Sequence, residues 1–191
     1  LYYSKSGSVK ELASFIARGI NSVDGAEAKI RTVPEIFPEV KNQKNSIPET
    51  GSLYANLDDL SNCSALALGS PTRFGNMAAP LKYFIDTATP LWLKGSLENK
   101  PACVFTSTGS LHGGNESTLL SMHIPLFHMG MIVLGLPYSI PELSKTNSGG
   151  TPYGASHVSN QEKVLSISEE EKKLCIAQGI RLAEITLKLN K

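Results

Sequence analysis

The chain is 191 residues long and 41% hydrophobic, which suits one globular domain over residues 1–191 and excludes a disordered chain. Its 18 basic and 17 acidic residues leave a formal net charge of +1, which argues against a nucleic-acid or membrane-surface binder. No apolar run approaches the roughly 20 residues that a membrane-spanning helix requires, so we expect a soluble protein without a membrane span.

The three cysteines are scattered and show no CxxC or CxxH spacing, so we expect neither a disulfide framework nor a metal site. Cys63, Cys103 and Cys175 each lie in an apolar or helical stretch. Reduced thiols in the core are the simplest interpretation, and they suit a cytoplasmic protein.

The first half of the chain alternates between expected strands and helices. Residues 1–3 end an apolar run, which we interpret as a first strand truncated at its N-terminus; a cleaved signal peptide is disfavoured. A helix is expected over residues 9–23, where apolar residues recur at i, i+3 and i+4. Residues 26–33 alternate like a half-buried strand, and residues 65–68 are typical of a buried strand. Two more helices are expected, near residues 57–60 and from Met77 to Ile85.

The second half continues the alternation. Residues 102–105 form a third continuous apolar run, and residues 115–128 predict a helix that Pro125 should kink or restart. Gly130 suits a helix C-cap before a short buried strand over residues 131–134. A last helix begins with a Ser-x-x-Glu capping box, Ser168 to Glu171, and runs through Leu189.

This order predicts an α/β fold, a three-layer doubly wound arrangement with five parallel strands covered by helices on both faces. Two connections, residues 34–56 and 135–164, are too long to be simple turns. The first is rich in Lys, Asn and Glu, which is consistent with mobility. The second contains residues 149–154, whose glycines and tyrosine suggest an ordered contact surface.

Ligands of open α/β sheets bind beyond the carboxyl ends of the strands, so we searched the loops at those ends. Residues 4–8 combine three serines with Gly7, which suits a phosphate group at a helix N-terminus, although an ordinary polar turn is an equal alternative. The patterns GxxxxGK[ST] and GxGxxG are both missing, which argues against a P-loop and a Rossmann fingerprint.

The other two loops could also contact a ligand. The second offers hydrogen-bond donors to a flat ring, and the third allows its main chain to approach a ligand closely. Thr72, Arg73 and Asn76 offer hydrogen-bond donors beside Phe74, which suits a heteroaromatic ring with polar edges. Residues 109–114 contain three glycines, which allow the main chain to approach a ligand closely. His123 and His157 have no assignable partner, and we expect surface or structural roles for both.

Five segments together resemble the WrbA family over nearly the whole chain: residues 69–76 (GSPTRFGN), Leu91-Trp92, residues 107–109 (STG), residues 128–131 (HMGM) and residues 149–154 (GGTPYG). Members of that family are flavodoxin-like NAD(P)H:quinone oxidoreductases that hold FMN. The resemblance therefore implies a flavodoxin-like fold, bound FMN, NAD(P)H as co-substrate, a quinone substrate and a homotetramer whose active sites form between subunits.

The resemblance also implies site residues. The FMN phosphate would be wrapped by Ser4, Lys5, Ser6, Gly7, Ser8 and Val9. The isoalloxazine ring would lie against Thr72, Arg73 and Phe74, and Gly75 and Asn76 would also contact the cofactor. The ribityl chain and the flavin edge would be covered by Ser107, Thr108, Gly109, Ser110, Leu111 and His112. Trp92 would come from a neighbouring subunit to form a wall of the substrate space.

This chain departs from the family at two positions. Ser6 replaces a tyrosine that lies near the nicotinamide cofactor, and Met129 replaces the second histidine of a His-His-Gly-Met motif beside the flavin. A proton-donating or quinone-orienting role would then pass to His128 or to water.

The expected reaction is a two-electron transfer from NAD(P)H to quinones by a ping-pong mechanism, with the chemistry on FMN and no essential nucleophile. Three alternatives remain open: a flavodoxin-like electron carrier, an FMN or azo reductase without quinone specificity, and an interaction protein. The balanced charge argues against a carrier, which would use a surface of one sign for steering.

Overall fold

The computed structural model describes residues 1–36, 51–160 and 166–190. Twelve elements follow one another in these residues: α1 (Ser8–Asn21), α2 (Leu57–Asn62), β1 (Leu66–Arg73), β2 (Asn76–Met77), α3 (Ala79–Thr87), α4 (Thr89–Leu93), β3 (Pro101–Thr108), α5 (Asn115–His128), β4 (Ile132–Val133), α6 (Glu142–Lys145), β5 (Ala155–Val158) and α7 (Glu169–Leu189). Most of the first long connection, which we interpreted as consistent with mobility, lies outside the described residues.

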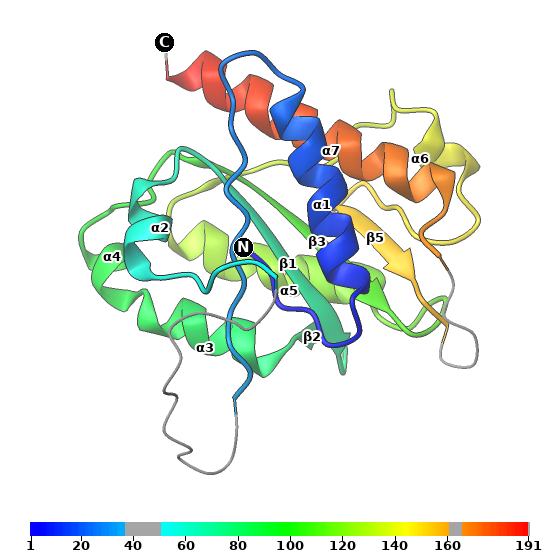
Figure 1. The fold of residues 1–191 in the computed structure, drawn as a ribbon, viewed down its shortest axis with the longest axis horizontal. Coiled ribbons are helices and arrows are strands. Elements are labelled where there is room, and N and C mark those ends of the chain that lie inside the picture. The colour runs from blue at the N-terminus through cyan, green and yellow to red at the C-terminus, as the bar shows by residue number, and fades with distance from the viewer. Residues whose placement is uncertain (37–50, 161–165, 191) are drawn as a thin grey trace.

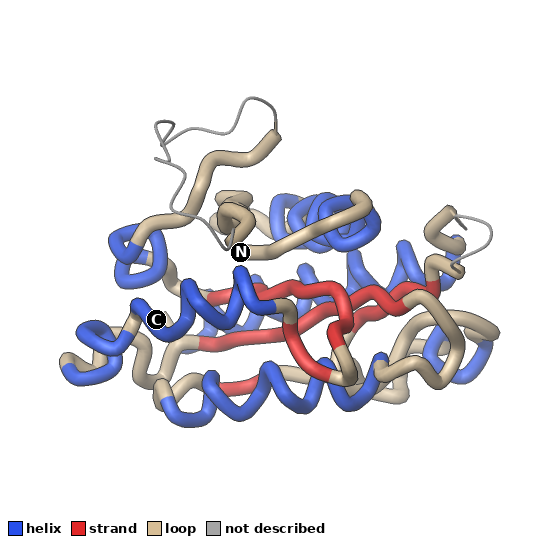
Figure 2. The backbone as a smooth tube through the Cα atoms, turned by 90° about the horizontal axis from the view of Figure 1, so that it is seen from below, coloured by secondary structure: helices blue, strands red, loops and turns tan. Residues whose placement is uncertain are grey.

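Helices cover both faces of the central sheet, as the strand–helix alternation predicts (Figure 1, Figure 2). Helices α1 and α7 lie together on one face, where their apolar residues meet Phe105 of β3 and Ala155 of β5. Helices α2, α3 and α5 cover the other face and pack against β1 and β3. The three-layer doubly wound architecture is therefore confirmed.

The sheet has the order β2-β1-β3-β4, and β5 also pairs with β3. All pairings are parallel except the short antiparallel pair β1–β2. Strand β4 pairs with the start of β3 and β5 with its end, so the two share one position in the sheet. Strand β5 was not among the expected strands, because its residues lie in a long connection without clear periodicity.

The first expected strand and the strand expected over residues 26–33 continue the sheet beyond β1. Tyr2 forms parallel bridges to Gly69 on one side and to Thr32 on the other, and Thr32 bridges to Tyr54. Each contact is a single bridge and not a ladder. Residues 26–30 alternate between half-buried and exposed positions, as expected, but no regular strand forms over them.

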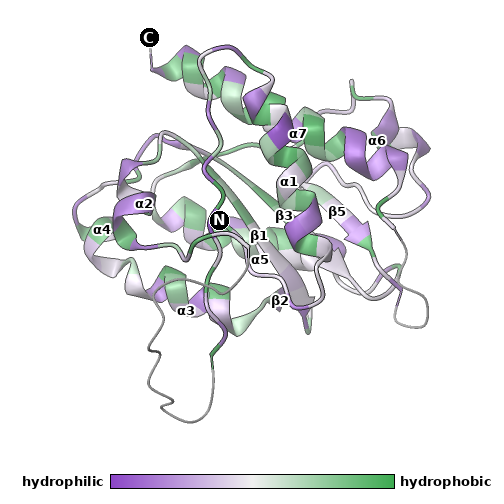
Figure 3. Ribbon diagram, in the orientation of Figure 1, coloured by the Kyte–Doolittle hydropathy of each residue, from purple (hydrophilic) through white to green (hydrophobic). Residues whose placement is uncertain are grey.

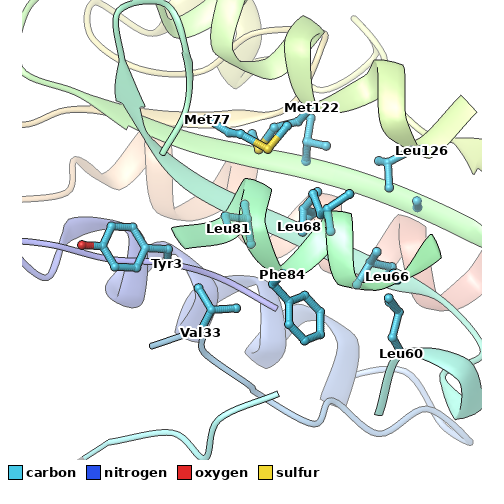
Figure 4. Close-up of a cluster of buried hydrophobic side chains, with 14 of the residues drawn as sticks. Tyr3, Val33, Leu60, Leu66, Leu68, Met77, Leu81, Phe84, Met122 and Leu126 are labelled. Atoms are coloured by element: carbon cyan, nitrogen blue, oxygen red, sulfur yellow. The ribbon is translucent and has the colours of Figure 1, made fainter. Parts of the chain in front are cut away.

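The larger part of the core lies between the sheet and helices α3 and α5 (Figure 4). Leu68, Leu81 and Met122 are almost fully buried there. Hydrophobic residues follow the central strand β3, and hydrophilic residues gather on outward-facing helices such as α6 (Figure 3). Burying this apolar surface is the main source of stability for such a domain.

Two glycines allow α1 and α7 to cross at close range. A Cβ at Gly19 would lie 2.1 Å from the carbonyl oxygen of Ile176, and one at Gly179 would lie 2.1 Å from that of Ile16. Neither distance leaves room for a methyl group. The two helices therefore meet backbone to backbone on the sheet.

The helix boundaries follow the expected signals with one exception. Ser168 and Glu171 form the predicted capping box at the start of α7, and Gly130 follows α5 with a φ of 74°. Pro125, which we expected to kink or restart the helix, lies inside one helix that continues to His128, so the helix does not restart there. Pro125 cannot donate the helical hydrogen bond to the carbonyl of Ser121, but its neighbour Leu126 is anchored in the core.

The cysteines agree with the expectation of reduced core thiols. All three are free, and Cys103 and Cys175 are buried while Cys63 is half-buried. Burial raises the pKa of the Cys103 thiol to about 12 and raises those of the other two. Among the described residues, no helix is long and apolar enough to cross a membrane.

Candidate active site

Three donor-rich loops meet at the edge of the sheet where the parallel strands end. Tyr3 donates its main-chain N–H to Gly69 of β1 at 2.9 Å, and Pro71 of β1 pairs with Ser107 of β3. The loops that follow these strands therefore start side by side. This is the position at which open α/β sheets bind ligands, and it agrees with the prediction from the sequence.

The first loop, residues 4–8, ends at the N-terminus of α1. Gly7 is the N-cap with a φ of 102°, and its amide donates to the Ser4 hydroxyl oxygen at 3.1 Å. No side chain caps the helix, and a Cβ at Gly7 would have no neighbour within 4 Å. The amides of the first turn, from Ser8 onward, therefore have no side-chain cap, and the helix dipole favours an anion at such an end.

Lys5 does not point freely toward this helix end. Its ammonium group donates to the Glu35 carboxylate, which also accepts a hydrogen bond from the Tyr3 hydroxyl at 3.2 Å. The hydrogen bond from Lys5 holds the pKa of Glu35 below its usual value. Glu35 was missed by the sequence analysis because it lies at the start of a connection with little periodicity.

The second loop is the tight hairpin between β1 and β2. Arg73 pairs with Asn76 across a two-residue turn, and both turn residues, Phe74 and Gly75, have positive φ values of 51° and 74°. Such turns favour Asn, Asp or Gly, so a phenylalanine here is a backbone outlier. Phe74 is completely exposed. Backbone strain of this kind is typical of ligand sites.

The hairpin is held against the N-terminus of α5. The hydroxyl groups of Thr72 and Thr118 lie 3.0 Å apart, and a Cβ at Gly114 would lie 3.1 Å from the Cα of Gly75. The Arg73 guanidinium donates to the Thr72 carbonyl at 2.8 Å, which leaves most of its donors free at the surface.

The third loop is more closed than the sequence suggests. Ser107 and Thr108 are buried, and the Thr108 hydroxyl donates to the carbonyl of Ser110 at 3.0 Å. Beyond them Ser110, Leu111 and His112 are exposed, and His112 has a positive φ of 58°. The exposed part of the loop, and not its first two hydroxyl groups, is therefore the part open to a ligand.

A buried carboxylate, that of Glu171, stabilises the segments that lie next to this edge of the sheet. Glu171 accepts hydrogen bonds of 2.8 Å from Nδ1 of His157, from the amide of Ser168 and from the amide of Gly149. Burial alone would raise the pKa of Glu171, but these hydrogen bonds, first that from His157, lower it below its usual value. His157 is thus structural, as expected, and so is His123, which is buried against the ring of Phe127.

Strand β5 brings a further serine to the edge that the sequence analysis did not identify. Ser159 follows β5 and donates both its amide and its hydroxyl group to the carbonyl of Thr108, at 2.8 and 3.0 Å. The Gly-Gly-Thr-Pro-Tyr-Gly segment just before β5 is ordered, and Thr151 bridges to Gly154. The glycines of residues 149–154 were the sequence feature that predicted an ordered segment here.

Three predicted site residues lie away from these loops. His128 ends α5 and Met129 caps it, about 20 Å along the helix from the Gly114 end by the usual rise per residue. Trp92 is half-exposed on α4, in the same region, because the turn after α4 contacts Gly130 through Glu98 and Asn99. Within one chain the fold does not bring these residues to the three loops.

The described residues contain no group of three or more His, Cys, Asp or Glu side chains that could hold a metal ion. The site therefore consists of hydroxyl groups, main-chain amides, one guanidinium and one exposed aromatic ring. Such a set suits an anionic group attached to a flat polar ring.

A parallel sheet between two helical layers, with a ligand edge of this kind, defines a flavodoxin-like α/β protein. In agreement, the flavodoxin, WrbA-like protein from Agrobacterium tumefaciens superposes with a TM-score of 0.69 at 19% identity, covering 98% of this chain and 94% of its own. Oxidised flavodoxin 1 from Bacillus cereus superposes with a TM-score of 0.61 at 18% identity, covering 96% and 94%. Both likenesses concern the fold.

Sequence similarity identifies the family. The chain belongs to the NADPH-dependent FMN reductase family, whose pattern matches residues 3–142. A protein named NAD(P)H dehydrogenase (quinone) from Acidithiobacillus ferrooxidans is 42% identical over 192 residues, which cover 99% of this chain and 96% of that protein. One of the same name from Geobacter sulfurreducens is 39% identical over 197 residues, covering 100% and 97%.

Proposed function

We propose that this chain is an FMN-dependent NAD(P)H:quinone oxidoreductase of the WrbA type. The observation that carries the proposal is the meeting of three donor-rich loops at the uncapped N-terminus of α1. The relatives' names support the quinone as electron acceptor and NAD(P)H as electron donor.

The loop geometry fits a flavin mononucleotide. The left-handed Gly7 and the open space before α1 suit the phosphate, which would accept hydrogen bonds from first-turn amides and from the hydroxyl groups of Ser6 and Ser8. The strained hairpin at Phe74 would hold the edge of the flavin ring, and the exposed part of the third loop, residues 110–112, the ribityl chain. The Glu35 carboxylate keeps Lys5 beside this site.

When bound, FMN supplies the redox chemistry, which is hydride acceptance from NAD(P)H and then two-electron transfer to a quinone in a ping-pong sequence. The chain's own groups bind and orient. Arg73 would present its free N–H donors to the ring, and the hairpin would set the open face on which nicotinamide and quinone alternate. The free thiols suit a reducing compartment such as the cytoplasm.

We further propose that the complete active site forms between subunits of a homotetramer. Trp92, His128 and Met129 lie far from the loops of their own chain, so they would reach a flavin only from another copy. An apolar stripe on α5 supports such an assembly: Leu120, Ile124 and Phe127 are 44%, 59% and 61% exposed. Exposed apolar patches of this kind mark interaction sites.

The test starts with FMN binding to the purified protein, followed after removal of excess flavin by visible absorbance. We expect retained flavin that bleaches with NADH or NADPH in the absence of air and recolours with benzoquinone. Retained flavin that stays yellow with both nicotinamides would favour the electron carrier. A chain that retains no FMN would contradict the flavin site itself.

A pair of variants tests whether Arg73 belongs to the flavin site. Arg73→Ala should weaken FMN binding or shift the flavin reduction potential, whereas Arg18→Ala, an exposed arginine in the last turn of α1, should do neither. Equal behaviour of the two variants would remove Arg73 from the site.

A further inference from the structure

The proposed reduction of a quinone requires one proton in addition to the hydride. The hydride brings both electrons, and its addition converts the quinone into the monoanion of the hydroquinone. The phenolate oxygen of that monoanion must then take up a proton to give the neutral product. A side chain that supplies such a proton typically accelerates the step by about 10²–10⁴-fold. The site would therefore gain from a group that releases a proton near neutral pH.

Several proton-bearing groups at this edge of the sheet hold their protons too tightly for that task. The Lys5 ammonium group and the Tyr3 hydroxyl both donate to the Glu35 carboxylate. The hydrogen bond to Glu35 raises the pKa of Lys5 above its usual value, and burial together with Glu35 raises the pKa of Tyr3. A guanidinium group such as that of Arg73 does not release its proton in proteins.

Histidine is the side chain that exchanges a proton near neutral pH, and the chain has four histidines. His123 and His157 are buried. His128 ends α5, about 20 Å along the helix from Gly114. His112 is exposed in the third loop, and within the described part of the chain its ring forms no hydrogen bond. It is therefore the one histidine that a single chain brings to the three loops with its ring free.

A tight turn fixes the main chain at His112. The carbonyl of Ser110 accepts hydrogen bonds from the amide of Gly113 at 3.1 Å and from the Thr108 hydroxyl at 3.0 Å, which anchors the turn to the end of β3. Leu111 and His112 form the tip of the turn and are both exposed. His112 has a φ of 58°, which is uncommon for a residue other than glycine. The imidazole thus extends to the surface from an anchored turn.

The same turn lies beside the hairpin that we propose to hold the flavin ring. A Cβ at Gly114 would lie 3.1 Å from the Cα of Gly75, so the two loops are in contact at these glycines. Phe74 is one residue away from that contact, and His112 is two residues away. Because consecutive Cα atoms are 3.8 Å apart, the Cα atoms of Phe74 and His112 lie within about 4 and 8 Å of it. Both exposed rings therefore start from the place where the two loops meet.

We propose, on the basis of the proposed function, that His112 is the proton donor for quinone reduction. Its ring would extend past the ribityl chain to the substrate on the open flavin face. The imidazolium form transfers one N–H proton to the phenolate oxygen of the hydroquinone monoanion, which leaves a neutral hydroquinone and a neutral imidazole. Solvent then returns a proton to the exposed ring.

Two charged groups lie on the elements around this turn. Among the described residues of the hairpin, of the first turn of α5 and of the segment after β5, they are Arg73 and Glu116. A guanidinium favours the phenolate that accepts the proton, and a carboxylate favours the imidazolium that donates it. The signs of both charges are therefore compatible with proton transfer from His112.

The experiment compares the FMN-loaded parent chain with the variant His112→Asn. Asparagine also tolerates a positive φ, so the turn is preserved while the acid is removed. Anaerobic stopped-flow absorbance follows the reduction of bound flavin by NADH or NADPH and then its reoxidation. The oxidant is either menadione, a quinone, or ferricyanide, which accepts electrons without a proton. We expect the variant to match the parent chain within about twofold in flavin retention, flavin reduction and reoxidation by ferricyanide, but to be at least about tenfold slower with menadione.

Two further measurements report on the proton itself. In the parent chain the menadione step should slow as the pH rises from about 6 to 9, because the imidazolium is lost, whereas in His112→Asn it should change little. The other measurement needs no turnover. In NMR spectra of the oxidised, FMN-loaded protein, the His112 ring signals, identified by their absence from the variant, should shift when phenol is added as a redox-inert substitute for the hydroquinone.

Equal menadione rates for the parent chain and His112→Asn would overturn the proposal. Equal losses with menadione and ferricyanide would also overturn it, because they would indicate damage to the flavin site and not a missing proton. A loss in His128→Asn, with full menadione turnover in His112→Asn, would assign the proton to His128 of another copy. A parent chain whose flavin is reduced by neither nicotinamide would contradict the proposed function, and the role of His112 with it.

Discussion

Single residues at the active-site edge carry conformations that other side chains tolerate poorly. Gly7 adopts a φ of 102°, where L side chains are strained, but a Cβ would meet no neighbour. Gly7→Val should therefore disturb the loop without a clash in the core. We expect at least a tenfold rise in the Kd for FMN, about 1.4 kcal/mol. Fluorescence titration of FMN measures it, with Gly25→Val, a positive-φ glycine after α1, as the matched control.

A second prediction at the scale of a single residue concerns Glu171 and the pH dependence of the folding stability. Its carboxylate is buried and its pKa lies below the usual 4.5, because His157 and two main-chain amides donate to it. Its stabilising contribution is complete above pH 4.5, the unfolded value, and is lost as the pH falls through the lower folded value.

Glu171→Gln replaces one acceptor oxygen with a donor, so at least one buried N–H loses its partner. We expect about 1–3 kcal/mol lower free energy of unfolding at pH 7, and a smaller loss between pH 5 and pH 3 than in the parent chain. Urea unfolding at several pH values measures both. Glu184→Gln, at an exposed position of α7, should change neither. A parallel pH dependence of the two variants would contradict the assignment.

At the scale of elements, the crossing of α1 and α7 depends on two glycines. Alanine is favoured over glycine in a helix by about 1 kcal/mol, but a methyl group at Gly179 would lie 2.1 Å from the carbonyl oxygen of Ile16. Overpacking typically costs 1–3 kcal/mol, and here the obstacle is main chain that cannot rotate away. Gly179→Ala should therefore destabilise the protein in denaturant unfolding. A stabilised variant would mean that the helices separate without cost.

The elements that could be predicted from the sequence are those whose own pattern is strong. Helices α1 and α7 have periodic apolar faces and a capping box, and β1 and β3 are continuous apolar runs. Strand β5 could not be predicted, because its pairing with β3 is a long-range contact and its four residues carry no period of their own. Of the two outcomes expected at Pro125, a restart of the helix does not occur, since core packing of Leu126 holds the last turn in place.

The same distinction applies to the site. The loops after Tyr3, β1 and β3 were predicted because each follows an apolar run and is rich in Ser, Thr and Gly. The partners of those loops were not predicted. Glu35 and Ser159 act through contacts over 30 and 51 positions along the chain, which no local pattern encodes.

At the scale of the whole molecule, the proposed active site requires a second copy of the chain. The loops lie at one end of α5, whereas Trp92, His128 and Met129 lie near the other. The apolar stripe on α5 connects the two ends along the surface. A substitution in the stripe should consequently separate flavin binding from catalysis.

Ile124→Glu tests this directly, because Ile124 is 59% exposed at the centre of the stripe and its replacement should leave the fold intact. A buried, unpaired carboxylate at an interface costs several kcal/mol, enough to dissociate an assembly of ordinary affinity. We expect light scattering to show smaller species, FMN affinity within about threefold of the parent chain, and quinone turnover reduced at least tenfold. Leu189→Glu, at a similarly exposed apolar position on α7, should preserve both assembly and turnover. Full turnover by dissociated Ile124→Glu protein would show that one chain forms the whole active site.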